Sequence, residues 1–125
     1  MNSKSLSTAH IACVKILLEC IAKKDYKIEY GKIVDEISIS PNKIGSVLGD
    51  ISTICHELGL PFISVMVVQK NTNVCGSGFF ELCEKLNIHA KCNELLEEVK
   101  KCIHWNILAD YFKIIVFHTH MKQSF

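Results

Sequence analysis

The sequence of 125 residues contains no arginine, so all 14 of its basic residues are lysine. Arginine binds guanine edges, carboxylates and phosphates through paired hydrogen bonds, and this mode of recognition is therefore excluded. The 14 basic residues nearly balance 13 acidic ones, which gives a formal charge of +1. This balance also excludes a strongly basic nucleic-acid-binding tail. Any nucleic-acid contact should therefore be local, based on lysine and the backbone, sensitive to salt and poor at reading guanine.

Long apolar runs are also missing. The longest ones, such as Val65–Val68, are far too short to cross a bilayer. The first segment of the chain is interrupted by His10, Lys15 and Glu19, which is typical of an amphipathic helix instead of a secretion signal. Because 49% of the residues are hydrophobic, the chain can build the core of a single domain. We therefore expect a cytoplasmic protein that makes no membrane contact.

The seven cysteines include no C-x-x-C pair, so neither a zinc knuckle nor a thioredoxin-like site is supported. Five of them occupy apolar positions of helical patterns, where a reduced thiol acts as a small hydrophobic side chain. These five are Cys13, Cys20, Cys55, Cys83 and Cys102.

The helical periodicity is clearest in the first half of the chain. Apolar spacing predicts an amphipathic helix over 5–24 and a shorter one over 30–37. Ser40 and Pro41 are suited to begin a third helix, which Gly59 and Pro61 should end. Two helices joined by a break of three or four residues would form a helix-turn-helix-like pair.

The period changes after Pro61. Residues 62–70 are rich in β-forming side chains and precede turn residues, which predicts a strand and a short β wing. Overall we expect one α+β domain, mostly helical, with a winged-helix-like core and extra C-terminal helices. The chain should divide into an N-terminal helix (1–28), the helix pair and wing (29–80), a C-terminal part (81–117) and a polar tail (118–125). Towards the C-terminus we expect helices over 79–86, 91–103 and 105–112 and a last strand at 114–117.

Three segments occur in an order that resembles known DNA-binding domains. They are Tyr30–Val34, Ile44–Gly49 and Gly59–Phe79. The order of these segments resembles that in the winged-helix domain of alkyltransferase-like proteins. It resembles more closely a small domain found in bacterial restriction and HNH-nuclease contexts. The resemblance covers residues 30–111 and implies a DNA-binding module of the kind that occurs on phages and mobile elements.

The departures from these families limit what the resemblance implies. The chain has no Pro-Cys-His-Arg run, the nucleophile motif of alkyltransferases, so alkyl transfer is not expected. Cys75 stands where the related domain has proline before its first loop glycine. Asn73 replaces a loop glycine, although asparagine can still adopt a left-handed turn.

Nucleic-acid binding would use the exposed face of the helix after Pro41, the preceding helix and the wing. Asp50 and Glu57 on the same helix oppose this interpretation, because their charges would repel phosphates. The candidate residues are Lys32, Asn42, Lys43, Ser46, Lys70, Asn71, Asn73, Gly76 and Ser77.

The loop 75–78 has two interpretations. Its glycines could leave N–H groups available to a phosphate, or they could simply permit a tight connection. Cys75 has no histidine beside it in sequence, which argues against a nucleophile. His118 and His120 have a spacing that can hold a metal, but a solvated pair without metal is favoured. We therefore predict no catalytic residue, no metal and no cofactor.

The alternative function is a small inhibitor or adaptor that binds a protein of a defence or nuclease system. Aromatic side chains dominate such interfaces, and Phe79, Phe80 and Trp105 are the candidates. Adjacent helical residues cannot both face the core, so either Phe79 or Phe80 should be exposed, and we predict a homodimer contact through that ring. The sequence therefore favours a non-enzymatic recognition module for DNA, with a protein partner as the alternative.

Overall fold

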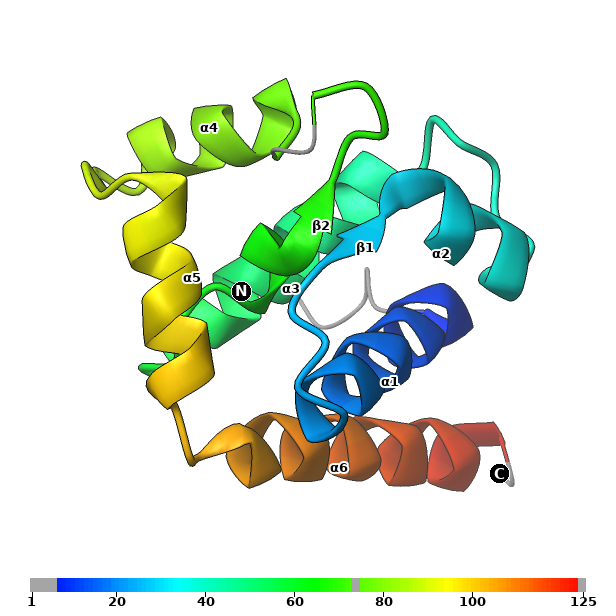
Figure 1. The fold of residues 1–125 in the computed structure, drawn as a ribbon. Helices are drawn as coiled ribbons and strands as arrows, with labels where there is room; N and C mark the ends of the chain where they lie inside the picture. The colour runs from blue at the N-terminus through cyan, green and yellow to red at the C-terminus, as the bar shows by residue number, and fades with distance from the viewer. Residues whose placement is uncertain (1–6, 73–74, 124–125) are drawn as a thin grey trace.

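The computed structural model describes residues 7–72 and 75–123, except for the side chains at 77 and 115–123. The described chain is mostly helical and carries a small two-stranded parallel sheet. In Figure 1, α3 lies behind β2 at the centre, α5 covers one side and α6 runs along the lower edge beneath α1. The elements are α1 (Thr8–Ala22), β1 (Ile28–Glu29), α2 (Tyr30–Ile37), α3 (Ile44–Glu57), a 3-10 helix (Ile63–Met66), β2 (Val67–Val68), α4 (Ser77–Lys85), α5 (Cys92–Lys101) and α6 (Trp105–Gln123).

The centre of the core is the packing of α1 against α3. Cys13 and Leu17 of α1 and Ile51 and Cys55 of α3 are completely buried. Burial of each large aliphatic side chain stabilises the fold by about 1.5–3 kcal/mol. The prediction that thiols fill the core is confirmed for Cys13, Cys55 and Cys83, whereas Cys20 and Cys102 are only partly buried. All seven cysteines are free thiols.

The helix α2 spans the predicted residues, but α3 begins later than the sequence suggests. Pro41 does not start the helix, because the chain first makes a tight turn in which the N–H of Lys43 donates to the carbonyl of Ser40 at 2.9 Å. Ser38 ends α2 in the left-handed conformation, with φ of 53°. The helices are therefore separated by residues 38–43, and α2 packs on α1.

The strand predicted over 62–70 is wrong for most of its length. Residues Ile63–Met66 form a 3-10 helix whose four side chains are all buried. A continuous apolar run of this length does not distinguish a strand from a buried helical turn. Only Val67–Val68 is extended, and it pairs in parallel with Ile28–Glu29. The described residues therefore contain no antiparallel hairpin of the kind expected for a wing.

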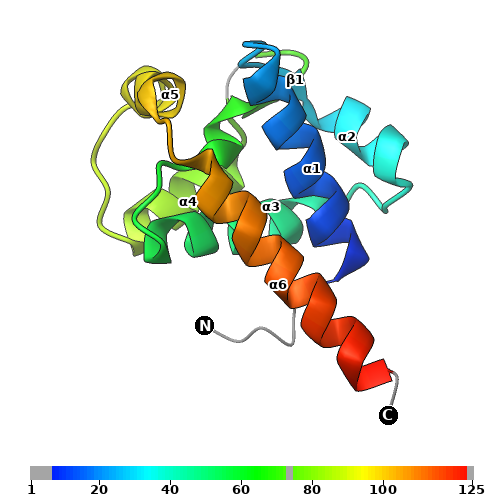
Figure 2. The same ribbon diagram turned by 90° about the horizontal axis from the view of Figure 1, so that it is seen from below.

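The strand predicted at 114–117 is also wrong, and so is the tail predicted at 118–125 as far as residue 123, because α6 continues through Gln123. The last two residues of the predicted tail lie outside the described residues. The β-branched residues of this stretch favour a strand, but the preceding helix extends through them at less cost than a new element would require. Figure 2 shows the end of α6 projecting beyond α1.

Candidate functional site

A cleft of about 280 Å³ opens between the first half of α3 and the first turn of α4. No charged side chain lines it, so a ligand of either sign meets no direct repulsion from its walls. Its lining residues are Tyr30, Pro41, Asn42, Ile44, Gly45, Leu48, Gly49, Ser52, Ser64, Gln69, Gly76, Gly78, Phe79 and Leu82.

Tyr30 and Gly76 close one wall of the cleft. The N–H of Gly76 donates a hydrogen bond to the hydroxyl oxygen of Tyr30 at 3.2 Å. A Cβ atom at Gly76 would lie 3.0 Å from that oxygen and 3.4 Å from Nε2 of Gln69, so a larger residue would require these two side chains to shift. Burial raises the pKa of Tyr30 above its ordinary value of 10.0, although the Gly76 hydrogen bond opposes the shift. The phenol therefore stays protonated, and it can donate its own hydrogen to a ligand.

Small residues at helical spacing line the α3 side of the cleft. Gly45, Gly49 and Ser52 recur every three or four residues and so share one face of the helix. A Cβ atom at Gly45 or Gly49 would meet nothing within 4 Å, which shows that this face is open. The hydroxyls of Ser52 and Ser64 are buried and hydrogen-bonded to each other. The polar atoms of this pair are therefore already satisfied.

Two amide side chains reach the cleft from separate segments. Asn42 lines it from the turn before α3, and Gln69 lines it from the residue after β2. The hydroxyl of Ser40 donates to Oδ1 of Asn42, which orients that amide. An amide offers a donor and an acceptor side by side, a pattern that pairs with the edge of a nucleobase.

The predicted nucleic-acid residues divide into two groups in space. Asn42 and Gly76 line the cleft. The exposed Lys43 and Lys70 follow its two amides in sequence without lining it, and Lys43 also borders another depression beside α1 and the end of α2. Lys32 does not join them, because it lines a separate depression with Asp25 and Glu29. Two more candidates, Ser46 on α3 and Asn71 after Lys70, are exposed; Asn73 and the side chain of Ser77 lie outside the described residues.

Asp50 was expected to repel phosphates, but its carboxylate is bound to another side chain. Nε2 of the buried His10 lies 2.8 Å from Oδ2 of Asp50. The N–H of Ser7 donates to Nδ1 of His10 at 3.0 Å, so the imidazole hydrogen is on Nε2 and is donated to Asp50. Sequence reasoning assigned no role to His10; its helical position three residues after Ser7 was the available signal. The contact ties α1 to α3, and Asp50 does not line the cleft.

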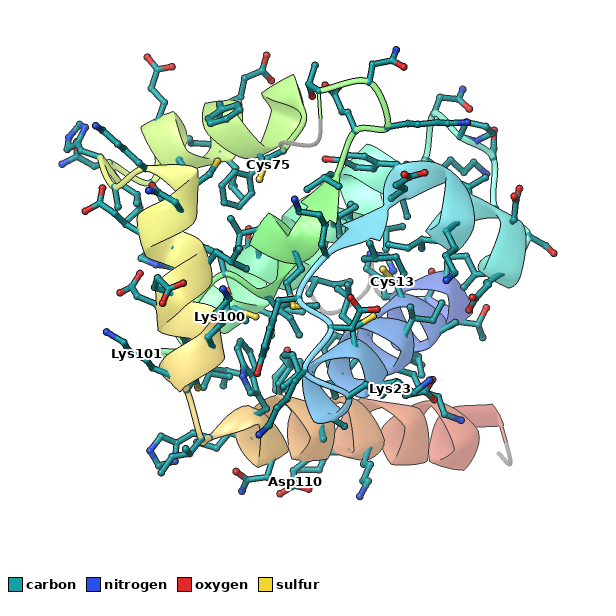
Figure 3. All side chains as sticks on the ribbon, viewed as in Figure 1. Cys13, Lys23, Cys75, Lys100, Lys101 and Asp110 are labelled. Carbon is teal, nitrogen blue, oxygen red and sulfur yellow. The ribbon has the colours of Figure 1, made fainter. Side chains whose placement is uncertain are left out.

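The thiol of Cys75 is a structural group. It is buried between α4 and β2 (Figure 3), where it donates to the carbonyl of Val65 at 3.4 Å and lies 3.5 Å from the sulfur of Cys92. Burial and the neighbouring Cys92 raise its pKa from 9.0 to about 12. A thiol with this pKa is almost entirely protonated at neutral pH, so the geometry does not favour a nucleophile.

The three aromatic candidates differ in exposure. Phe79 and Trp105 are core residues, each 8% exposed, whereas Phe80 is 49% exposed. The prediction that one ring of the Phe79–Phe80 pair is exposed is therefore confirmed. The indole N–H of Trp105 donates to the carbonyl of Val99 at 3.4 Å, at the end of α5. Of the three, only Phe80 offers its ring to a partner.

The described residues contain no group of three or more side chains that could hold a metal ion. The side chains of His118 and His120 lie outside the description. Within the described chain, none of the helices has the length and apolar character needed to span a membrane. No protein-family model, curated protein or solved structure matches this sequence.

Proposed function

We propose that this chain is a non-enzymatic recognition module that binds nucleic acid, DNA in the first place, at the cleft between α3 and α4. The observation that carries the proposal is the convergence of Asn42 and Gln69 on one uncharged cleft. The lysine that follows each amide, Lys43 or Lys70, is exposed and suited to a phosphate.

Each part of this surface has a distinct task. The ammonium groups of Lys43 and Lys70 neutralise backbone phosphates and set the position of the strand. The amides of Asn42 and Gln69 face base edges, and adenine is the base that an amide matches best. The hydroxyl of Tyr30 adds one more donor to the cleft wall. The carboxylate of Asp50 is held by His10 and does not line the cleft, so it does not face a ligand bound there.

Binding should be weak and only moderately dependent on salt. Two lysine–phosphate contacts give a slope of about −2 for log affinity against log salt concentration. Affinity should therefore fall about tenfold between 50 and 200 mM salt. The measurement is fluorescence anisotropy of labelled duplex and single-stranded DNA across this salt range.

Matched variants make the test specific. Lys43→Ala and Lys70→Ala should each weaken binding and reduce the slope by about one. Lys101→Ala removes an exposed lysine from α5 and serves as the control, with no change expected. Absence of binding at low salt, or equal losses in the three variants, contradicts the proposal.

The alternative function, a small inhibitor or adaptor of a defence or nuclease protein, is favoured by the exposed ring of Phe80. Exposed aromatic side chains are enriched at protein interfaces. If two copies associate through this ring, light scattering should report a dimer at high concentration that Phe80→Ser converts to a monomer. A monomer at all concentrations contradicts that contact.

A further inference from the structure

A second surface lies away from the cleft, where α1 and α6 run side by side. Its groove encloses about 330 Å³, and five of its seven lining residues are apolar. In α1 the lining residues follow the helical spacing of one face, and in α6 they do the same. They are Ile11, Val14, Lys15 and Leu18 of α1, and Ala109, Phe112 and Lys113 of α6.

The groove has a firm floor and an accessible upper part. Val14 and Phe112 are buried in the core, whereas Ile11 and Leu18 are only partly covered. The small side chain of Ala109 keeps the α6 wall low. A ridge of larger apolar side chains from another helix can therefore enter between the two helices.

The charge around the groove has one sign. Each wall carries one exposed lysine, Lys15 on α1 and Lys113 on α6, and no acidic side chain lines the groove. Among the described residues, neither ammonium group has an ion-pair partner. Glu19 follows Lys15 by one turn but does not line the groove, and Asp110 projects from α6 away from α1 (Figure 3).

We propose that this groove binds an amphipathic helix of a partner protein, with acidic residues on both sides of its apolar face. The apolar face would pack on Ile11, Leu18 and Phe112, and the carboxylates would meet Lys15 and Lys113. A concave apolar strip suits the convex side of a helix, whereas a flat bilayer would contact only its edges. The low polarity of the floor likewise disfavours a nucleic acid, which presents phosphates.

The test uses the full chain and two synthetic helical peptides with the same apolar face. Leucines at spacings of three and four residues form that face, and glutamates flank it in one peptide and lysines in the other. Binding of the fluorescein-labelled peptides is measured by anisotropy at low salt. The acidic peptide should bind at least tenfold more tightly than the basic one, because each rim contact changes from attraction to repulsion.

Reversing the charges of the two groove lysines should reverse which of the two peptides binds more tightly. The double variant Lys15→Glu/Lys113→Glu should bind the acidic peptide about tenfold or more weakly than the wild type does, and it should bind the basic peptide more tightly. The control Lys85→Glu/Lys101→Glu changes the net charge equally on α4 and α5 and should keep the original preference. Both pairs lie on exposed helix surfaces, so all variants should fold.

Four results would overturn the proposal. They are equal binding of the two peptides, equal loss in the control, a dimer that the groove variant dissociates, and binding to anionic phosphatidylserine vesicles in place of the peptide. The third result would assign the groove to a second copy of the chain, and the fourth to a lipid surface.

Discussion

Alkaline pH should destabilise this fold sharply, because three core thiols cannot lose their protons while they are buried. Burial raises the pKa of Cys13, Cys55 and Cys75 from 9.0 to about 12 each. Between these values the unfolded chain loses thiol protons that the folded chain keeps, so deprotonation favours unfolding. Their contribution to stability is full below pH 9 and is lost progressively up to about pH 12.

The size of the effect follows from these pKa values. At pH 10 each thiol lowers the free energy of unfolding by about 1–1.5 kcal/mol relative to neutral pH. The three together should remove about 4 kcal/mol, a large part of the 5–15 kcal/mol that stabilises a typical domain. Urea unfolding followed by circular dichroism from pH 7 to pH 10, in a reducing buffer, measures this loss.

Two variants separate the thiols from other groups that titrate above pH 9. Cys13→Ala should lower the stability at pH 7 but reduce the pH-dependent loss by about 1 kcal/mol, the share of one thiol. Val14→Ala truncates a buried neighbour without a titrating group and should keep the full pH dependence. A wild-type stability that is constant to pH 10, or an unchanged loss in Cys13→Ala, would refute the reasoning.

Three further substitutions test the geometry of the cleft and of the α1–α3 contact by thermal unfolding. Gly49→Ala should stabilise the protein by about 1 kcal/mol, because its new Cβ meets nothing within 4 Å and glycine is unfavourable inside a helix; a lower melting temperature would mean that this face is covered. Tyr30→Phe should cost about 1 kcal/mol, since the N–H of Gly76 loses its acceptor; an unchanged melting temperature would argue against that bond. His10→Ala should cost about 2–3 kcal/mol, because a buried ring is removed and Asp50 loses its donor, and a cost near zero would contradict the contact.

The helices were predictable where one face is apolar and the ends are marked. Residues 30–37 form α2 as predicted, because their apolar stripe follows the helical period without interruption. Within the strand predicted over 62–70, residues 63–66 were predicted wrongly, because all four side chains are buried and the segment therefore has no period to read. Residues 114–117 failed for a related reason, since intrinsic β preference is weaker than the extension of an existing helix.

The cleft itself could be predicted only in part. Asn42 and Gly76 were predicted as binding residues and line the cleft, whereas the spacing of Gly45 and Gly49, which could have indicated a helix face without side chains, was not used. The opposite wall depends on the parallel pairing of Ile28–Glu29 with Val67–Val68, which brings Tyr30 to Gly76 across 46 residues of sequence. No local pattern encodes such a pairing, because it depends on long-range packing.

The two proposed surfaces lie at opposite edges of the fold, the cleft near α4 and the groove at α6 (Figure 1). Between them, α1 and α3 are joined by the buried core and by the contact of His10 with Asp50. An occupant that fills the groove without displacing α1 therefore leaves the dimensions of the cleft unchanged, and the two affinities should be independent. A helix-binding surface and a nucleic-acid surface that operate independently would allow this small domain to hold both partners at once, which is what an adaptor requires.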